Sequence, residues 1–309
     1  MERGIALVTA QSARERDEDI APLTAALTAR GERVSLVNWD DSAVNWSAFD
    51  LALLRSPWDY TARLPEFLSW AKRASAETRL VNDLAVIQWN TDKHYLAELG
   101  AAGVATIPTR FAEPGDSAAH SIAGFLATVA GDAAEFVVKP AVGAGSQDAQ
   151  RFMRSETALA VQHLQRLLAA GKSALLQPYL SHVDEHGEAA LIYFAGRFSH
   201  SIRKNPMLVR EGSASSRGGL ASERITPRRA EADELRLAAQ LLAALPFDVP
   251  LYARVDLLRD AAGRPTLLEL ELTEPSLFLE SSVGAADRFA AAISALRASG
   301  TIHSGTAMA

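Results

Sequence analysis

The chain of 309 residues contains no cysteine. This absence excludes disulfide bonds, thiolate nucleophiles and cysteine-ligated metal sites together, and it fits a reducing compartment. Long apolar runs are also missing. The N-terminal run IALVTA precedes the charged stretch ERDED and is far too short for a signal sequence or a membrane span. We therefore expect a cytoplasmic protein that has no membrane partner.

Positive charge is in short supply as well. Lys and Arg number 31 against 37 Asp and Glu, which gives a net charge of -6. No run of basic residues is interleaved with aromatic ones, so nucleic acid is not expected as a partner. Hydrophobic residues, in contrast, make up 48% of the chain, enough to build two or three modules that share a cleft.

Short apolar strands alternate with amphipathic helices from the start of the chain. The predicted strands lie at 4–10, 33–39, 49–57 and 80–83, and the predicted helices at 19–30 and 64–76. This βαβ pattern predicts a doubly wound parallel sheet. We place this N-terminal, substrate-side domain at residues 1–88.

The rhythm changes after residue 88. Strands at 135–140 and 174–180 and a helix at 155–170 predict a smaller α+β lid module over residues 89–180. Two hairpins follow, one over 189–204 that turns at Ala195-Gly196 and one over 251–272, together with helices at 228–245 and 284–298. They predict a C-terminal catalytic domain over 181–303, with a polar loop at 205–224.

Two acids share one face of a predicted strand in TLLELELTEPS, residues 266–276. Alternation turns the leucines to one face and places Glu269 and Glu271 on the other, ~7 Å apart. Their mutual repulsion is ~2 kcal/mol at an effective dielectric of about 20. Hairpin pairing can bring Asp256 opposite them. Three carboxylates without histidine or cysteine favour Mg²⁺ or Mn²⁺, and the alternative is an acidic edge that prevents aggregation.

Two lysines upstream are candidates for binding phosphate. Lys93 follows Thr91 and Asp92, which together signal a helix start. Lys139 ends a buried strand in VVKPAVGAGS, where small residues let backbone N–H groups approach an anion. The loop matches neither a Walker A nor a GxGxxG motif, which counts against a P-loop enzyme and a nicotinamide site.

These motifs, in this order, resemble the ATP-grasp carboxylate–amine ligases over nearly the whole chain. That group includes glutathione synthetase and D-alanine–D-alanine ligase. The matching stretches are TDKHYL (91–96), VVKP (137–140), the loop 143–146, LLQPYL (175–180), GE (187–188), SIRK (201–204), ARVD (253–256) and ELELTEPS (269–276).

The resemblance implies an α/β fold of the ATP-grasp type, in which a parallel N-terminal sheet, a small lid and an antiparallel C-terminal sheet surround one cleft. It implies ATP and Mg²⁺ as cofactors and a small amino-acid-like substrate. The implied ATP-binding residues are Lys93, Lys139, Gly145, Ser146, Gln177, Tyr179 and Leu180, with Asp184 or Glu188 at the ribose. The implied metal ligands are Asp256, Glu269 and Glu271, and the implied catalytic residues are Arg203 and Lys204.

Two departures from the family pattern leave details open. Gln177 stands where an acid is frequent, which leaves the adenine contact open. Glu271 stands where asparagine is usual, which leaves open whether one or two metal ions bind.

A narrower resemblance, to the cycloserine-biosynthesis ligases that close an O-ureido-serine, rests on LLRSPWDYT (53–61), RFSHSIRKNP (197–206) and ELELTEPS. RSPWDY lies outside the carboxyl end of a strand, where α/β sheets bind ligands. Arg55 is then a clamp for a carboxylate, Asp59 a partner for an ammonium and Trp58 a wall of the pocket. The alternative is a strand-to-helix turn in which Asp59 is a cap and Trp58 is core.

The sequence therefore predicts an ATP-dependent ligase that activates a substrate carboxylate for attack by nitrogen, with ring closure favoured. Glu274 and Ser276 are assigned to the substrate side, and the loop 205–224 closes over the site or is a plain linker. The alternatives are an intermolecular amino-acid ligase and a non-catalytic nucleotide-binding module. The identity and chirality of the substrate stay open, as does the oligomeric state, with a homo-oligomer as one option.

Overall fold

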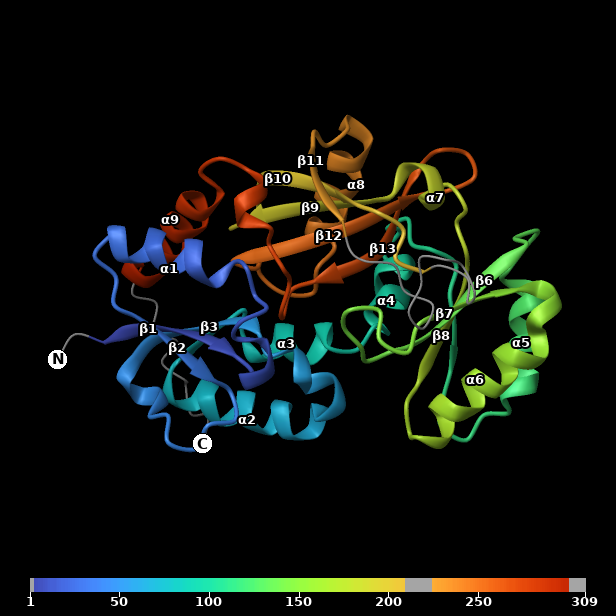
Figure 1. Ribbon diagram of the computed structural model, residues 1–309, viewed down its shortest axis with the longest axis horizontal. Helices are drawn as coiled ribbons and strands as arrows, with labels where there is room; N and C mark the ends of the chain where they lie inside the picture. Colours follow the sequence, from blue (N-terminus) through green and yellow to red (C-terminus); the bar gives the residue numbers. More distant parts are fainter. Residues whose placement is uncertain (1–2, 209–223, 300–309) are drawn as a thin grey trace.

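The computed structural model describes residues 3–208 and 224–299. Within these ranges the strands form three sheets: the N-terminal sheet at the lower left of Figure 1, a five-stranded sheet above it and a third sheet at the right. The predicted ATP-grasp arrangement of a parallel N-terminal sheet, a small lid and an antiparallel C-terminal sheet is confirmed, and the sheet of the lid is antiparallel as well.

The N-terminal sheet is parallel, in the order β2 (Val34–Asn38), β1 (Gly4–Thr9), β3 (Phe49–Ser56) and β4 (Arg79–Val81). Its strands are nearly continuous apolar runs because helices cover both faces. Ile5 and Leu7 pack toward α1 (Ile20–Ala29) and α9 (Ala285–Ala298). Ala6 and Val8 pack toward α2 (Leu64–Glu77) on the other face, as strand alternation requires.

The five-stranded sheet is antiparallel, in the order β11 (Ile225–Arg228), β10 (Arg197–Lys204), β9 (Glu188–Phe194), β12 (Tyr252–Arg259) and β13 (Pro265–Glu271). The predicted turn between β9 and β10 is confirmed, with φ of 47° at Ala195 and 74° at Gly196. These positive angles fit a two-residue hairpin loop. Helix α8 (Ala232–Ala243) packs on one face of the sheet through Leu237 and Leu241.

The third sheet has the order β5 (Arg110–Ala112), β8 (Ala174–Pro178), β6 (Glu135–Pro140) and β7 (Gln150–Met153). Helices α5 (Ala118–Thr128) and α6 (Thr157–Ala169) cover its outer face, at the right of Figure 1. Helix α5, whose first turn is a small-residue segment capped by Ser117, was not predicted from the sequence.

Short helices connect these layers. They are α3 (Leu84–Asn90), α4 (Tyr95–Ala101), α7 (Val183–His186) and the 3-10 helices η1 (Gln11–Ala13), η2 (Trp46–Ala48), η3 (Trp58–Ala62), η4 (Arg154–Glu156) and η5 (Leu279–Ser281).

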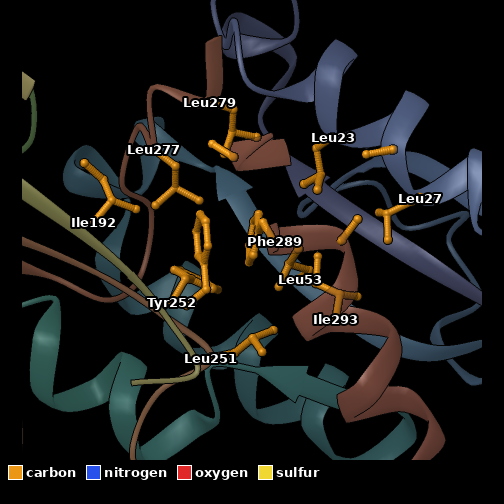
Figure 2. Close-up of a cluster of buried hydrophobic side chains, with 14 of the residues drawn as sticks. Leu23, Leu27, Leu53, Ile192, Leu251, Tyr252, Leu277, Leu279, Phe289 and Ile293 are labelled. Atoms are coloured by element: carbon orange, nitrogen blue, oxygen red, sulfur yellow. The ribbon is translucent and has the colours of Figure 1, made fainter. Parts of the chain in front are cut away.

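A buried apolar cluster joins the N-terminal sheet to the five-stranded sheet, and Figure 2 shows its side chains meeting around α9. Leu53 of β3, Tyr252 of β12 and Phe289 of α9 all belong to it. The rings of Phe289 and Phe194 stack with centroids 4.6 Å apart. Burial of these side chains fixes one sheet against the other, so residues from both can form one site.

Each of the three predicted modules contains one of the three sheets, and the bounds 1–88, 89–180 and 181–303 stay a prediction. Most of the predicted loop 205–224 lies outside the described residues. Of the helices in residues 3–208 and 224–299, none has the length and apolar character needed to cross a bilayer.

Candidate active site

A cavity of about 710 Å³ lies where the three sheets meet. Its walls come from the β12–β13 hairpin, from β6 and β8 of the third sheet, and from η1, η3 and the turn before α4. Most of the predicted site residues line it: Trp58, Asp59, Lys93, Lys139, Gly145, Ser146, Gln177, Tyr179, Leu180, Glu188, Lys204, Asp256, Glu269, Glu271, Glu274 and Ser276.

The hairpin pairing brings the predicted acids together. Asp256 lies directly opposite Glu269, and Arg254 lies opposite Glu271. Asp256 is buried and contacts Arg254 Nη2 at 2.8 Å and Lys204 Nζ at 3.0 Å. Burial alone would raise the pKa of Asp256, but these two cations lower it to about 2. Asp256 is therefore a fixed anion at neutral pH.

Lys93 faces the hairpin from the turn before α4. Its Nζ lies 2.9 Å from Glu269 Oε1 and donates to the backbone oxygen of Gly143 at 2.7 Å. Burial opposes the charge of Lys93, but attraction to Glu269 outweighs it and raises the pKa above the ordinary value. The lysine thereby ties the β13 acid to the small loop 143–146.

Lys139 lines the same part of the cavity from the end of β6. It makes no hydrogen bond or ion pair with the described part of the chain, and burial lowers its pKa to about 8. A partly buried ammonium without an acidic partner is suited to binding an anionic ligand.

Burial also raises the pKa of two further carboxyl groups on the β13 side. Glu271 contacts Arg254, yet burial and the neighbouring acids raise its pKa to about 8. Glu274 accepts a hydrogen bond from Tyr60 Oη at 2.7 Å, and burial raises its pKa to about 7.

Glu188 and Asp184 were both candidates for the ribose contact, and the structure separates them. Glu188 lines the cavity and pairs with Lys204 at 2.6 Å. Gly187 allows this close approach, because a Cβ there would lie 2.4 Å from the backbone oxygen of Lys204. Asp184 does not line the cavity, and it binds Arg151 and the hydroxyl of Tyr179 instead.

The end of the cavity beside β8 is apolar. Ile107, Val183 and Leu258 form a buried cluster there with Tyr179, Leu180 and Leu268. Gln177 lies at its edge and donates from Nε2 to Thr109 Oγ1 at 2.8 Å, which leaves its carbonyl oxygen as an acceptor. This end can enclose a flat apolar ring that carries polar edges.

The N-terminal domain supplies the opposite end. Trp58 lines the cavity and donates from Nε1 to the backbone oxygen of Glu274 at 3.0 Å. Asp59 also lines it, but its carboxylate accepts from Trp39 Nε1 at 2.8 Å and pairs with Arg63 at 3.3 Å. Asp59 is thus already paired with Arg63, whereas the sequence predicted that it would pair with an ammonium group of the substrate.

Arg55 does not reach the cavity, which corrects the predicted carboxylate clamp. Its side chain is 0% exposed because β3 is buried on both faces. Its Nη2 lies 3.5 Å from Asp19 and donates to the backbone oxygen of Pro275 at 2.8 Å. Asp19 in turn accepts from the backbone N–H groups of Leu277 and Leu279. Arg55 and Asp19 therefore anchor the segment 275–279 that follows β13.

Arg203 also lies outside the cavity. Alternate residues of a strand point to opposite faces, so β10 turns Lys204 inward and Arg203 outward, where it donates to the backbone oxygen of Glu185. Arg254 occupies the inner position instead, 5% exposed, beside Asp256 and Glu271. Sequence reasoning missed Arg254, although its place two residues before Asp256 on one strand was a usable signal.

The acids were predicted to share a divalent metal ion. Among the described residues, no three His, Cys, Asp or Glu side chains converge at metal-binding spacing. The donor set still fits a hard cation, because five carboxyl groups face four cationic side chains. They are Glu188, Asp256, Glu269, Glu271 and Glu274 against Lys93, Lys139, Lys204 and Arg254. With all five acids ionised, the four cations leave one negative charge unbalanced, which a divalent cation would offset.

Comparison with known proteins identifies the family. The chain is 42% identical over 294 residues to the cycloserine biosynthesis protein DcsG of Streptomyces lavendulae, an alignment that covers 94% of this chain and 97% of that protein. The chain belongs to the DcsG family. The family model for the N-terminal domain of D-cycloserine synthetase DcsG matches residues 5–82. The crystal structure of D-cycloserine synthetase DcsG superposes with a TM-score of 0.88 at 40% identity and covers 95% of this chain and 99% of that one.

More distant structures share only the fold of this DcsG-family chain. The ATP-grasp ligase PsnB, in complex with a precursor variant, Mg and ADP, has a TM-score of 0.65 at 14% identity, covering 96% of this chain and 99% of that one. D-alanine–D-alanine ligase from Bacillus anthracis in complex with ATP has a TM-score of 0.67 at 16% identity, covering 96% and 98%. The DcsG-family chain described here is an ATP-grasp ligase that forms C–N bonds.

Proposed function

We propose that this ligase uses ATP and a divalent cation to close O-ureido-D-serine into cycloserine. The observation that carries the proposal is one continuous cavity of about 710 Å³ with an apolar end, a lysine-lined middle and a small polar end. The similarity of this chain to DcsG over nearly its whole length supports the substrate class.

The apolar end suits adenine, and the middle suits the phosphates. The cluster around Leu180 and Leu258 encloses the base, while Gln177 offers a carbonyl oxygen to its amino group. Lys93, Lys139 and the N–H groups of the loop 143–146 then face the phosphates, and Glu188 faces the ribose. Asp256, Glu269 and Glu271 would hold Mg²⁺ or Mn²⁺, which would neutralise negative charge during phosphoryl transfer.

The proposed chemistry has three steps. The substrate carboxylate attacks the γ-phosphorus, and ADP leaves to give an acyl phosphate. The nitrogen on the side-chain oxygen then attacks the acyl carbon, and phosphate leaves with the C–O bonding electrons. The five-membered ring contains the carboxyl carbon, Cα, Cβ, oxygen and nitrogen, and water removes the carbamoyl group from that nitrogen as carbon dioxide and ammonia.

Arg254 replaces Arg203 as the proposed electrostatic catalyst. It lies inside the cavity between Asp256 and Glu271, and its backbone position on β12 is fixed by pairing on both sides. A preorganised cation at this place stabilises the charge that develops on the transferred phosphoryl group. Lys204, beside Asp256 and Glu188, adds a second positive charge from the same face of the sheet.

Ring closure within one molecule needs no pocket for a second amine, because proximity replaces it. The test is mass spectrometry of products formed from O-ureido-D-serine and Mg-ATP, beside its L-enantiomer and mixtures of ordinary amino acids. We expect cyclic product and stoichiometric ADP from the D-compound alone. Dipeptides from the mixtures and no cyclic product would replace ring closure by intermolecular ligation, and no ADP release with any substrate would indicate a binding module.

A further inference from the structure

Glu274 differs from the other four carboxyl groups of the inner cavity. Glu188, Asp256, Glu269 and Glu271 each form an ion pair with a lysine or arginine. Glu274 is 7% exposed and lines the cavity, yet it has no ion pair with any residue in the described ranges. Its Oε1 accepts from Tyr60 Oη at 2.7 Å, and its Oε2 makes no hydrogen bond to the described part of the chain.

The segment that carries Glu274 is held at several points. Trp58 donates to its backbone oxygen, and Arg55 donates to the backbone oxygen of the next residue, Pro275. Asp19 accepts from Leu277 at 2.5 Å and from Leu279 at 2.7 Å. The free oxygen of Glu274 is thus preorganised at the polar end of the cavity, away from the adenine end.

The proposed nucleophile needs a proton acceptor. The lone pair of a ureido nitrogen is delocalised into its carbonyl group, so this nitrogen attacks well only if its proton leaves as the bond forms. We propose that Glu274 accepts the proton of the ring-closing nitrogen and that Tyr60 is the positioning residue for its carboxylate. This inference rests on the proposed function. The C–N bond forms, the bond from the acyl carbon to phosphate breaks, and Glu274 later releases the proton to water.

The charges around Glu274 suit this role. Burial raises the pKa of Glu274 to about 7. The hydrogen bond from Tyr60 on η3 and the charges of Lys93, before α4, and of Arg254 on β12 act to lower this pKa, whereas the charge of Glu269 on β13 acts to raise it. A general base works best when its pKa lies near the working pH. Asp256, whose pKa is lowered to about 2 by Arg254 and Lys204, is a far weaker proton acceptor.

The test separates acyl phosphate formation from ring closure. Hydroxylamine traps the acyl phosphate as a hydroxamate and is nucleophilic without a protein base. In Glu274→Gln we expect cyclic product to form ~100-fold more slowly or worse, the usual contribution of a general base, while trapped hydroxamate and ADP change only a few-fold. The matched control is Glu280→Gln, an exposed acid on η5, in which both rates should equal those of the unsubstituted enzyme.

Tyr60→Phe supplies a second readout. Because the hydrogen bond from Tyr60 lowers the pKa of Glu274, its removal should move the acid limb of the ring-closure rate to higher pH and leave the pH dependence of hydroxamate formation unchanged. This measurement keeps the inference testable even if Glu274→Gln does not fold.

Two outcomes would overturn the inference. One is an equal loss of hydroxamate and cyclic product in Glu274→Gln, which would assign Glu274 to binding or structure. The other is a pH profile that Tyr60→Phe does not move. Failure of the proposed function gives a different result: the unsubstituted enzyme itself would form hydroxamate but no cyclic product.

Discussion

Glu269 and Glu271 lie two residues apart on β13. Neutralising Glu271 should stabilise the ligand-free protein at high pH, whereas neutralising Glu269 should destabilise it. Burial and neighbouring acids raise the pKa of Glu271 to about 8 from 4.5, whereas Lys93 and Lys139 overcome burial and lower that of Glu269. A carboxyl group with a raised pKa stabilises the folded state fully only below about pH 4.5. This stabilisation is lost progressively as the pH rises from 4.5 through about 8.

The magnitude for Glu271 follows from these values. At ~1.4 kcal/mol per pH unit, ionising Glu271 at pH 9 costs the folded state up to ~5 kcal/mol. Its side chain is 22% exposed and contacts Arg254, so solvent and the ion pair reduce the effect to ~1–2 kcal/mol. Arg254 keeps Asp256 as its partner after Glu271→Gln. We therefore expect this variant to be more stable than the unsubstituted protein at pH 9, and the difference to be less than half as large at pH 6.

Glu269→Gln is the matched comparison. It leaves the buried ammonium of Lys93 with only the Gly143 oxygen as an acceptor. Loss of one partner of a buried pair costs ~3–5 kcal/mol, and ~1–3 kcal/mol is expected for a carboxylate that is partly exposed. Because Glu269 has a lowered pKa, this loss should be present at both pH 6 and pH 9.

The assay is thermal unfolding without nucleotide and with EDTA, at pH 6 and pH 9. One kcal/mol corresponds to ~2–4 °C in Tm for a chain of roughly this size. The expected result is a higher Tm for Glu271→Gln, with a clearly larger increase at pH 9 than at pH 6, and a lower Tm for Glu269→Gln at both pH values. Shifts in the same direction for the two variants at pH 9 would refute the assigned charge balance.

Three further predictions concern the site and its support. Lys93→Met and Lys139→Met should each raise the ATP KM or lower kcat at least about tenfold in an ADP-release assay, and unchanged kinetics would place that lysine outside the phosphate site. Arg254→Leu should lower kcat by ~100-fold or more, whereas Arg203→Ala should have little effect, and equal losses would return Arg203 to the mechanism. Asp19→Ala removes the acidic partner of the buried Arg55 and leaves two backbone N–H groups without an acceptor, so the free energy of unfolding in urea should fall by ~3–5 kcal/mol. A loss below ~1 kcal/mol would show that the pair does not anchor the segment after β13.

The sequence by itself determined the elements and much of the site. Apolar alternation located the strands, and the turn at Ala195-Gly196 was readable because both residue types fit its positive φ angles. The pairing of Asp256 with Glu269 followed from hairpin geometry, which is local along the chain. The order of Lys93, Lys139 and the β13 acids was sufficient to indicate an ATP-grasp ligase.

Only the tertiary structure decided which side chains face the cavity and which charges they meet. Periodicity states that Arg203 and Lys204 point to opposite faces, but the packing of α9 and α8 on the sheet determines which face is inner. Arg55 ends an apolar strand whose sequence does not reveal that Asp19 and Pro275 enclose it. The contact between Tyr60 and Glu274 joins residues 214 positions apart, and no local pattern encodes such a contact because it depends on how whole sheets pack together.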